Sequence, residues 1–328
     1  MNALHYTLIG AGALAAAAAV GAGVSFPYIH KLFKQSFGRA NPSTDGQHDY
    51  LDGLRSKGFE KQVEIVKAGW ERLANTPHKK VYITSHDGHK LCAKLYASEH
   101  PVATVVLVHG YHSKGEMDFG CVFDFYAKHN IGMLITYQRA HGESEGDYLT
   151  FGAKERFDVR DWCKYLVERY GEDHRIILDG VSMGCATILL ASCLPDIPVQ
   201  VKAVIGDCGY ASAKDQIGQV IKEHFHLPVG LVLPAASLLC RLYGGAFLGD
   251  ADVEREMKKA KIPTLFAHGL ADDFVLPQNS ERAYAACTSE YKRLCLFEGA
   301  PHGMSYLVCK EEYETEIIAL LRHAGVLD

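Results

Sequence analysis

A serine between two glycines is a candidate nucleophile. Ser182 is the centre of the pentapeptide at residues 180–184, which reads G-V-S-M-G. The apolar run at 175–179 predicts a strand before it, and the run at 183–193 predicts a helix after it. A serine on a sharp strand-to-helix turn exposes its hydroxyl, and the flanking glycines leave the space that such a turn requires. The pattern therefore predicts that Ser182 attacks a carbonyl carbon.

Two carboxylates and a histidine follow at positions from which they could activate this serine. Asp272 and Asp273 come just after a predicted strand at 263–267. His302 comes just after the next predicted strand, at 291–297. A neutral imidazole can take the serine proton and return it to the leaving group, while a carboxylate orients the ring. The order serine, acid, histidine fits this chemistry, and the spacing alone leaves both aspartates open.

Backbone amides complete the expected chemistry, because the tetrahedral intermediate carries a negative oxygen. One donor should be the N–H of Met183, the residue after the nucleophile. The other should be the N–H of Tyr111, which follows V-H-G at the end of a predicted strand. This reaction requires no cofactor and no metal. The 10 cysteines have no zinc-site spacing, and we expect buried, reduced thiols.

The elements that must position these groups alternate from residue 80 onward. Strands are predicted at 81–85, 90–96, 104–108, 132–137, 175–179, 201–207, 263–267 and 291–297, and helices at 118–129, 155–170, 183–193, 277–287 and 311–322. Apolar strands between helices indicate a mostly parallel sheet covered on both faces. The first two strands flank Asp87-Gly88, a hairpin signal, and belong at one edge. The carboxyl ends of parallel strands then bring the candidate triad together.

A segment at about 213–250 interrupts this alternation. Its apolar run is broken by Pro228 and Pro234, which excludes a sheet strand. Because the insertion precedes the strand that leads to the acid, we expect a small helical cap above the nucleophile. The apolar side chains of this cap either pack wholly as core or form a wall for an acyl chain, and we predict that Leu231 and Leu233 contribute to such a wall.

The N-terminal segment differs from the rest of the chain. Residues 7–29 contain no charged side chain and, as a helix, would be about 34 Å long, enough to cross a bilayer. We interpret residues 1–30 as a membrane anchor, with a cleaved signal peptide as the alternative. Lys31, Lys34 and Arg39 follow the segment, which places the hydrolytic domain on the cytoplasmic side by the positive-inside rule.

A polar helical linker is expected at 31–79, followed by the main domain at 80–328. Four apolar residues in the linker share one helix face and should dock on that domain: Val63, Val66, Trp70 and Leu73. On this division, a chain that starts near Asn41 should be soluble and active.

The charge of the chain gives no basis for nucleic-acid binding. The formal net charge is -5, and no sustained run of Lys and Arg forms a stripe that could follow a phosphate backbone. We therefore expect a small-molecule substrate.

Residues 80–328 resemble α/β-hydrolases of the bacterial, membrane-anchored, lysophospholipase-like and esterase group. The matching motifs lie at 108–110, 139–146, 180–184, 207–210, 268–272 and 301–303. The resemblance implies an α/β-hydrolase fold with a small helical cap, and its pattern H-G-x-x-D-x-x-V selects Asp272 over Asp273. One position departs from the pattern, Ala140, where relatives carry glycine.

These observations predict a serine hydrolase that cleaves carboxylic esters with a hydrophobic acyl or alcohol part. A thioesterase or a serine peptidase could use the same triad and stays open as an alternative. A non-catalytic binding protein of this fold is disfavoured, because all three triad residues are present.

Overall fold

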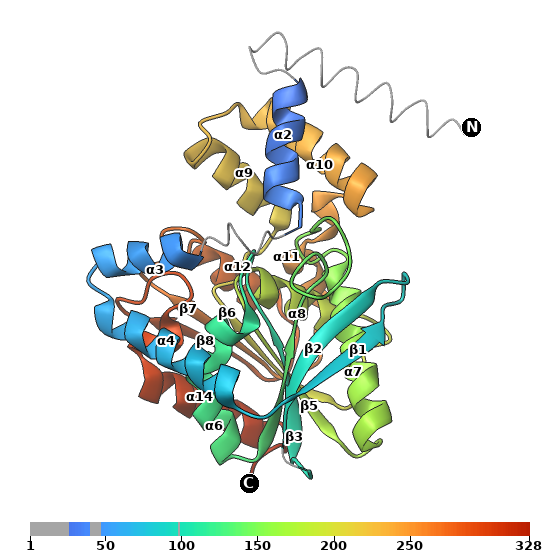
Figure 1. The fold of residues 1–328 in the computed structure, drawn as a ribbon, viewed down its shortest axis with the longest axis vertical. Coiled ribbons are helices and arrows are strands. Elements are labelled where there is room, and N and C mark those ends of the chain that lie inside the picture. Colours follow the sequence, from blue (N-terminus) through green and yellow to red (C-terminus); the bar gives the residue numbers. More distant parts are fainter. Residues whose placement is uncertain (1–25, 40–46, 98) are drawn as a thin grey trace.

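The computed structural model describes residues 26–39, 47–97 and 99–328 (Figure 1). Most of the predicted anchor, residues 7–25, lies outside the described residues. No helix in the described ranges combines the length and the apolar character that crossing a bilayer requires.

An eight-stranded sheet forms the centre of the molecule, in the order β1-β2-β4-β3-β5-β6-β7-β8. The strands are β1 (Lys79–Thr84), β2 (Lys90–Tyr96), β3 (Ala103–Val108), β4 (Ile131–Thr136), β5 (Arg175–Val181), β6 (Val201–Asp207), β7 (Thr264–Gly269) and β8 (Lys292–Phe297). β1 pairs antiparallel with β2, and β2 antiparallel with β4, while every other pair is parallel. β3 and β4 are buried along their whole length, as expected for strands covered on both faces.

Helices cover both faces of this sheet (Figure 1). One buried cluster joins α7 (Glu155–Tyr170), α8 (Met183–Ser192) and α12 (Gln278–Ala286) to one face. A second cluster joins α6 (Phe123–Lys128) and α14 (Lys310–His323) to the other. Shorter helical elements connect these layers: α5 (Gly115–Phe119), η1 (Gly120–Val122), α11 (Val253–Glu256), η4 (Met257–Lys259) and α13 (Ser305–Val308). The predicted mostly parallel sheet flanked by helices is confirmed.

The insertion between β6 and β7 is helical. α9 (Ala213–Glu223) and α10 (Val229–Leu239) are followed by η2 (Cys240–Gly244) and η3 (Leu248–Asp250). Pro228 precedes the first turn of α10, where a missing N–H costs nothing, and Pro234 lies inside the helix. Together with α2 (Phe26–Phe37), α9 and α10 form the upper lobe in Figure 1.

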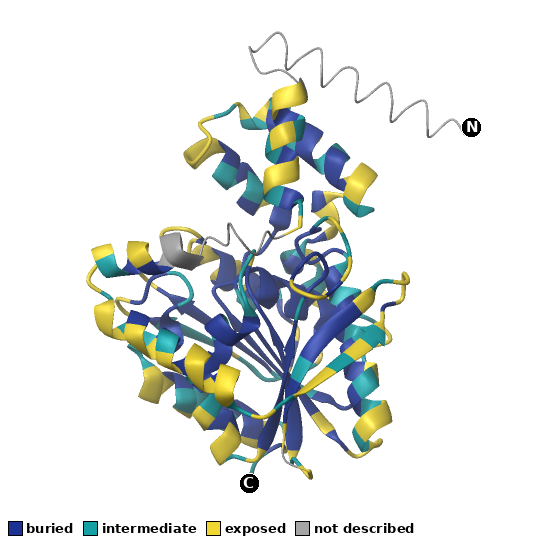
Figure 2. Cartoon of the chain, in the orientation of Figure 1, coloured by how far each residue is buried: buried dark blue, intermediate teal, exposed yellow. Residues whose placement is uncertain are grey.

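Helix α2 packs against this insertion and belongs to the folded domain. Ile29, Phe33 and Phe37 are at most 3% exposed and belong to the same buried cluster as the α10 residues Val232 and Ala236. In Figure 2, α2 alternates between exposed residues in yellow and buried residues in dark blue, as expected for a helix with one buried side. Ile29 and its neighbours, the last residues of the predicted anchor, thus lie in a helix that packs on protein.

Helices α3 (Gln47–Ser56) and α4 (Glu60–Asn75) lie along the main domain (Figure 1). Val63, Val66 and Leu73 of α4 are buried, as their spacing suggested. Trp70 is 38% exposed instead, because Gly69 makes the close contact. A Cβ on Gly69 would lie 2.6 Å from the backbone of Gly120, so the two backbones touch there.

Candidate active site

Ser182 lies on a strained turn between β5 and α8. Its backbone has φ 56° and ψ −117°, a conformation that residues other than glycine rarely adopt. The Ser182 N–H donates to the carbonyl oxygen of Asp207 at 2.9 Å, which ties the turn to β6. A Cβ on Gly184 would come within 1.8 Å of the Val108 carbonyl oxygen, so this position requires glycine. The predicted reason for the flanking glycines therefore holds at Gly184.

The structure brings Ser182, His302 and Asp272 into one hydrogen-bonded relay. The Ser182 hydroxyl lies 3.0 Å from His302 Nε2, and His302 Nδ1 lies 2.7 Å from Asp272 Oδ2. A carboxylate only accepts hydrogen bonds, so Nδ1 carries the proton and Nε2 can accept from the serine. Ser182 is 8% exposed and Asp272 3% exposed, so the relay is shielded from bulk water.

The carboxyl of Asp272 is held in its ionised form by four donors. His302 and His268 approach Oδ2, and the N–H groups of Phe274 and Val275 donate to Oδ1 at 3.0 and 2.9 Å. Burial alone would raise the pKa of Asp272, but the hydrogen bonds from His268 and His302 outweigh it and hold that pKa below its usual value. The carboxylate is therefore a fixed negative partner for the His302 ring.

His268, in β7, also contacts the relay. Its Nε2 lies 2.7 Å from the Val275 carbonyl oxygen and 3.1 Å from Asp272 Oδ2. Both partners accept, so Nε2 carries the proton, and Nδ1 faces the Ser280 hydroxyl at 2.6 Å. The i, i+4 spacing of His268 and Asp272 was the available signal. His268 orients the carboxylate that orients His302.

Asp273, the alternative acid, points elsewhere. Its side chain is 73% exposed and forms an ion pair with Lys57 at 3.0 Å, just after α3. Among the two candidates, the geometry therefore brings Asp272 to the histidine and leaves Asp273 at the rim of the site.

A cavity of about 570 Å³ opens above Ser182. Its wall combines Ser182 and His302 with residues from five parts of the chain: Gly53, Leu54 and Lys57; Gly110, Tyr111, His112, Ser113, Met117 and Asp118; Val181; Asp273 and Phe274; Pro301 and Gly303. The expected acyl-chain wall was different, since neither Leu231 nor Leu233 is among these lining residues. Leu233 instead packs toward Gly218 of α9, because α10 uses that side to bury its apolar surface.

Helix α3 was missed as part of the site. The sequence suggested a linker because its composition is polar, yet Leu54 is only 4% exposed and lines the cavity. Leu51 is buried beside it, so the i, i+3 pair Leu51 and Leu54 was the signal that could have shown a docked helix.

The loop at 110–113, which we call the oxyanion loop after the role expected of Tyr111, runs beside Ser182 and lines the cavity. A Cβ on Gly110 would lie 3.6 Å from the Ser182 Cβ, which shows how close the loop runs. The Asp118 carboxylate accepts from the Gly110 N–H at 2.8 Å and from the Ser113 hydroxyl at 2.6 Å. Tyr111 lines the cavity from this loop, and Met183 is the first residue of α8 after Ser182.

Within the described ranges, two groups of side chains carry the residue types that ligate metals, and both have other partners. Cys208 lies with Asp272 and His302, which already bind each other. His86 lies with Asp87 and Asp158.

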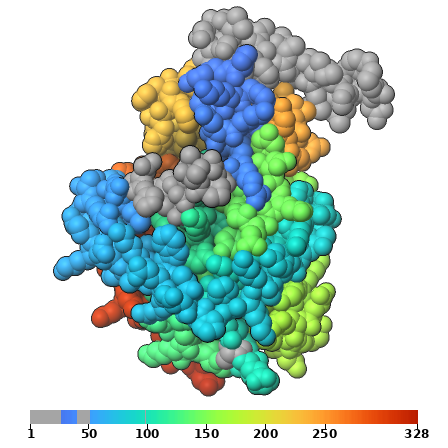
Figure 3. Space-filling model, in the orientation of Figure 1, coloured from blue at the N-terminus to red at the C-terminus, as the bar shows by residue number. Residues whose placement is uncertain are grey.

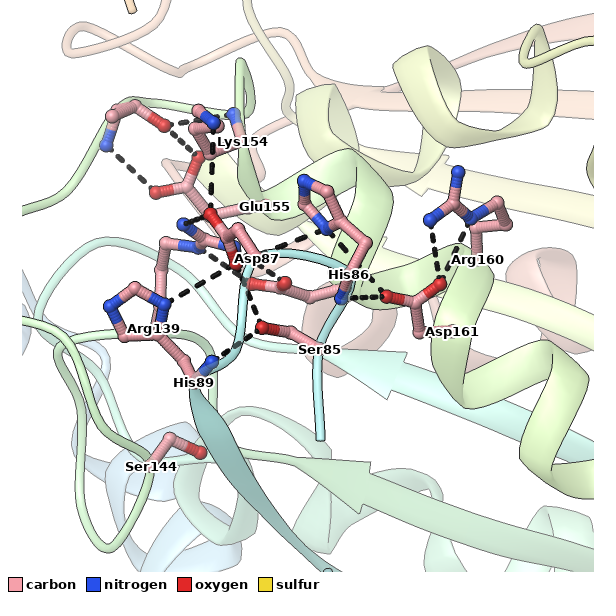
Figure 4. Close-up of polar contacts among 12 residues, drawn as sticks. Ser85, His86, Asp87, His89, Arg139, Ser144, Lys154, Glu155, Arg160 and Asp161 are labelled. Carbon is pink, nitrogen blue, oxygen red and sulfur yellow. Dashed lines mark hydrogen bonds and ion pairs between the residues drawn. The ribbon is translucent and has the colours of Figure 1, made fainter. Parts of the chain in front are cut away.

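The second group surrounds the buried Arg139 (Figure 4). The Arg139 guanidinium donates to Asp158 at 2.7 and 2.8 Å and to Asp87 at 3.0 and 3.1 Å. We call these three residues the Arg139 cluster. The fixed cation occupies the position between the carboxylates that a metal ion would take.

Comparison with known proteins gives a short family match and two partial sequence relatives. Residues 233–306, which carry Asp272 and His302, match the family described as serine aminopeptidase, S33. The chain is 28% identical to the uncharacterized protein YqkD of Bacillus subtilis over 188 residues, 56% of this chain and 60% of that protein. It is 28% identical to the thiohydrolase aneE of Aspergillus aculeatus over 156 residues, 44% of this chain and 48% of that protein. The chain thus spans three fifths or less of these relatives.

Solved structures extend the likeness to most of the chain. An esterase of Pyrococcus furiosus, Pf2001, superposes with a TM-score of 0.61 at 24% identity and covers 77% of this chain and 93% of its own. The esterase domain of a Rhodothermus marinus protein gives a TM-score of 0.53 at 18% identity, over 76% of this chain and 99% of its own. At these identities the likeness shows the fold, which is the α/β-hydrolase fold.

Proposed function

We propose that this chain, which has the α/β-hydrolase fold, is a serine esterase for carboxylic esters with a hydrophobic acyl or alcohol part. The observation that carries the proposal is the relay from Ser182 through His302 to Asp272 at the floor of a 570 Å³ cavity. A nucleophile, a base and an orienting carboxylate in hydrogen-bonded sequence are the parts that acyl transfer requires.

The reaction would run in two steps. Ser182 Oγ attacks the ester carbonyl carbon while its proton passes to His302 Nε2, and the carbonyl oxygen becomes negative. The N–H groups of Met183 and Tyr111 would stabilise this oxygen. His302 then gives its proton to the departing alcohol oxygen, which leaves an acyl group on Ser182. Water, deprotonated by His302, attacks that acyl group and releases the acid.

The cavity wall favours an apolar substrate part. Leu54, Met117 and Phe274 present hydrocarbon and aromatic surface next to the nucleophile. Each methylene that an acyl chain buries there contributes about 0.8 kcal/mol, so a few contacts raise kcat/KM by tens of fold. The preference should therefore come from α3, the oxyanion loop region and the segment after Asp272, with the cap outside the lining.

A peptide with a free N-terminus, the substrate of an aminopeptidase, fits this cavity less well. Binding a free α-ammonium group calls for an uncommitted carboxylate at the rim. Of the acidic lining residues, Asp273 is paired with Lys57, and Asp118 accepts from the oxyanion loop. A thioester fits the same cavity and the same relay, and similarity to a thiohydrolase makes it the second candidate.

The test is a panel of p-nitrophenyl esters from acetyl to hexanoyl, with a CoA thioester and an aminoacyl amide measured beside it. We expect kcat/KM to rise with chain length and the amide to be turned over least. Leu54→Ala should flatten the rise, whereas Leu231→Ala, a matched change on the cap, should preserve it. A preference for the amide would overturn the proposal, and a preference for the thioester would replace it with the second candidate.

We also propose that the uncharged N-terminal stretch attaches the enzyme to a membrane, with the hydrolase domain on the cytoplasmic side. Residues 7–25 would be about 28 Å long as a helix, close to the thickness of a bilayer core. The full chain should sediment with membranes and require detergent for release. Recovery of the full chain in the supernatant without detergent would contradict this.

A further inference from the structure

We propose that residues 36–39, which we call the strap, hold the oxyanion loop in its working position. This inference rests on the proposed function, and it adds positioning residues to that site. The strap consists of the last two residues of α2 and the two residues after them, far in sequence from Ser182. In Figure 3 the blue α2 segment runs between the yellow and orange parts of the cap down to the green loops of the main domain.

Two hydrogen bonds join the strap to the oxyanion loop. The Tyr111 hydroxyl donates to the Ser36 carbonyl oxygen at 2.8 Å. His112 Nε2 lies 3.1 Å from the Gly38 carbonyl oxygen, which can only accept, so Nε2 is the donor. His112 has φ 47°, a costly conformation that must be held by its surroundings. The two rings stack at 4.1 Å, so the contacts act on one rigid unit.

The strap is itself fixed to the main domain. Arg39 donates to the carbonyl oxygens of Gly142, Ser144 and Gly146 at 2.5–3.0 Å. The Phe37 carbonyl oxygen accepts from the Leu149 N–H at 2.7 Å. Arg39 is the residue that contributes most to fixing the strap, because its planar guanidinium reaches three carbonyl oxygens at once.

The oxyanion loop is thus held from two sides. Asp118 holds Gly110 and Ser113 from the protein interior. The strap holds Tyr111 and His112 from the outside, where Tyr111 is otherwise 39% exposed. The Tyr111 N–H is the proposed oxyanion donor, so its direction depends on both anchors.

This arrangement reverses the expectation that a chain starting near Asn41 keeps its activity. Such a chain would lose the strap and also Ile29, Phe33 and Phe37, which are buried against the cap and neighbouring loops. A displacement of about 1 Å in a positioning contact can cost roughly a hundredfold in rate, so small changes in the strap should be visible in kcat.

The experiment uses the full chain with single substitutions. Tyr111→Phe keeps the ring and removes the hydroxyl that reaches Ser36. Arg39→Ala removes the fastening, and Arg39→Lys restores a cation that reaches fewer acceptors. Tyr243→Phe is the matched control, because the Tyr243 hydroxyl also contacts α2, at His30, but lies on the cap.

We expect Tyr111→Phe to lower kcat about tenfold and Arg39→Ala between about tenfold and a hundredfold, with KM within about twofold. Arg39→Lys should recover part of the loss, and Tyr243→Phe should match the wild type. The rate of Ser182 labelling by a fluorophosphonate should fall by similar factors, while Tm stays close to the wild-type value.

Unchanged kcat and labelling rates in Tyr111→Phe and Arg39→Ala would overturn the inference alone. A rise in KM with unchanged kcat would do the same, because it would show a role in binding only. A wild-type chain that neither reacts with the probe nor hydrolyses any ester would overturn the proposed function and this inference together.

Discussion

Two clusters in this protein both combine histidine with aspartate, but one surrounds the candidate nucleophile and the other holds two elements of the fold together. The relay joins His302 to Asp272, and the Arg139 cluster joins Asp87 and Asp158 beside His86. In the relay the imidazole faces the cavity and the serine hydroxyl. In the Arg139 cluster a permanent cation lies between the carboxylates and fixes the β1–β2 hairpin to α7 (Figure 4).

The contrast shows what separates a reactive cluster from a structural one. The four donors to Asp272 in the described part of the chain are two imidazoles and two backbone N–H groups, so Asp272 can stabilise an imidazolium that forms only during the reaction. Arg139 remains charged at all working pH values, so Asp87 and Asp158 face a cation that is always present and does not form during a reaction. The four predictions below test this division.

The largest effect is expected from the nucleophile. Ser182→Ala should lower kcat by about 10⁶-fold and abolish fluorophosphonate labelling, because no other group can form the acyl-enzyme. Ser85→Ala is the control, because it removes a hydroxyl that donates to Asp87 in the Arg139 cluster. Its rate of fluorophosphonate labelling should stay close to that of the wild type. Labelling that survives Ser182→Ala would assign the nucleophile to another residue.

The second-largest effect on kcat is expected from a change of Asp272, the acid of the relay. Asp272→Asn should lower kcat by about 10⁴-fold, because the amide cannot hold His302 in the required tautomer or stabilise its charged form. Asp273→Asn removes only an exposed ion pair with Lys57 and should be mild. Steady-state kinetics on one ester decides between them, and the reverse order of effects would show that the geometry misidentifies the acid.

A substitution in the Arg139 cluster should lower the stability of the fold and change kcat much less. Arg139→Met leaves the buried carboxylate of Asp158 without its cation, which typically costs 3–5 kcal/mol of unfolding free energy. Urea unfolding measures this loss, and kcat per folded molecule should stay within about tenfold of the wild type. A loss of kcat with full stability would mean that the cluster takes part in the reaction.

The smallest effect is the acid dependence of stability. Burial would raise the pKa of Asp87, but hydrogen bonds from Arg139 and Ser85 outweigh it and keep that pKa below its usual value. The folded state therefore binds this proton less tightly than the unfolded state. The stabilisation is complete above about pH 4 and is lost as the pH falls below that value toward the lowered pKa.

Urea unfolding at pH 6, 5, 4 and 3 tests this dependence. The unfolding free energy of the wild type should fall mainly below about pH 4, and Asp87→Asn should reduce the slope there. An equal slope in both proteins would place the acid sensitivity at other carboxylates, such as Asp272, whose pKa is lowered in the same direction.

Much of the fold was predictable because its signals are local. The buried strands were located to within one or two residues, because short continuous apolar runs between helices are typical of buried strands. The strand-to-helix turn at Ser182 was equally local. The contribution of helix α3 to the cavity wall was not predicted, because its two buried leucines are a weak pattern in a polar segment.

The sequence by itself determined the alternation of strands and helices, the glycines around Ser182 and the order of the three relay residues. The spacing alone left both aspartates open and the family resemblance selected Asp272, but only the tertiary structure brings Asp272 to His302 and shows that His268 supports it. The same is true of the cavity wall and the strap, whose partners are about 75 or more positions apart in the chain. Spacing along a chain reports which side chains share one element, whereas contacts between elements depend on how those elements pack.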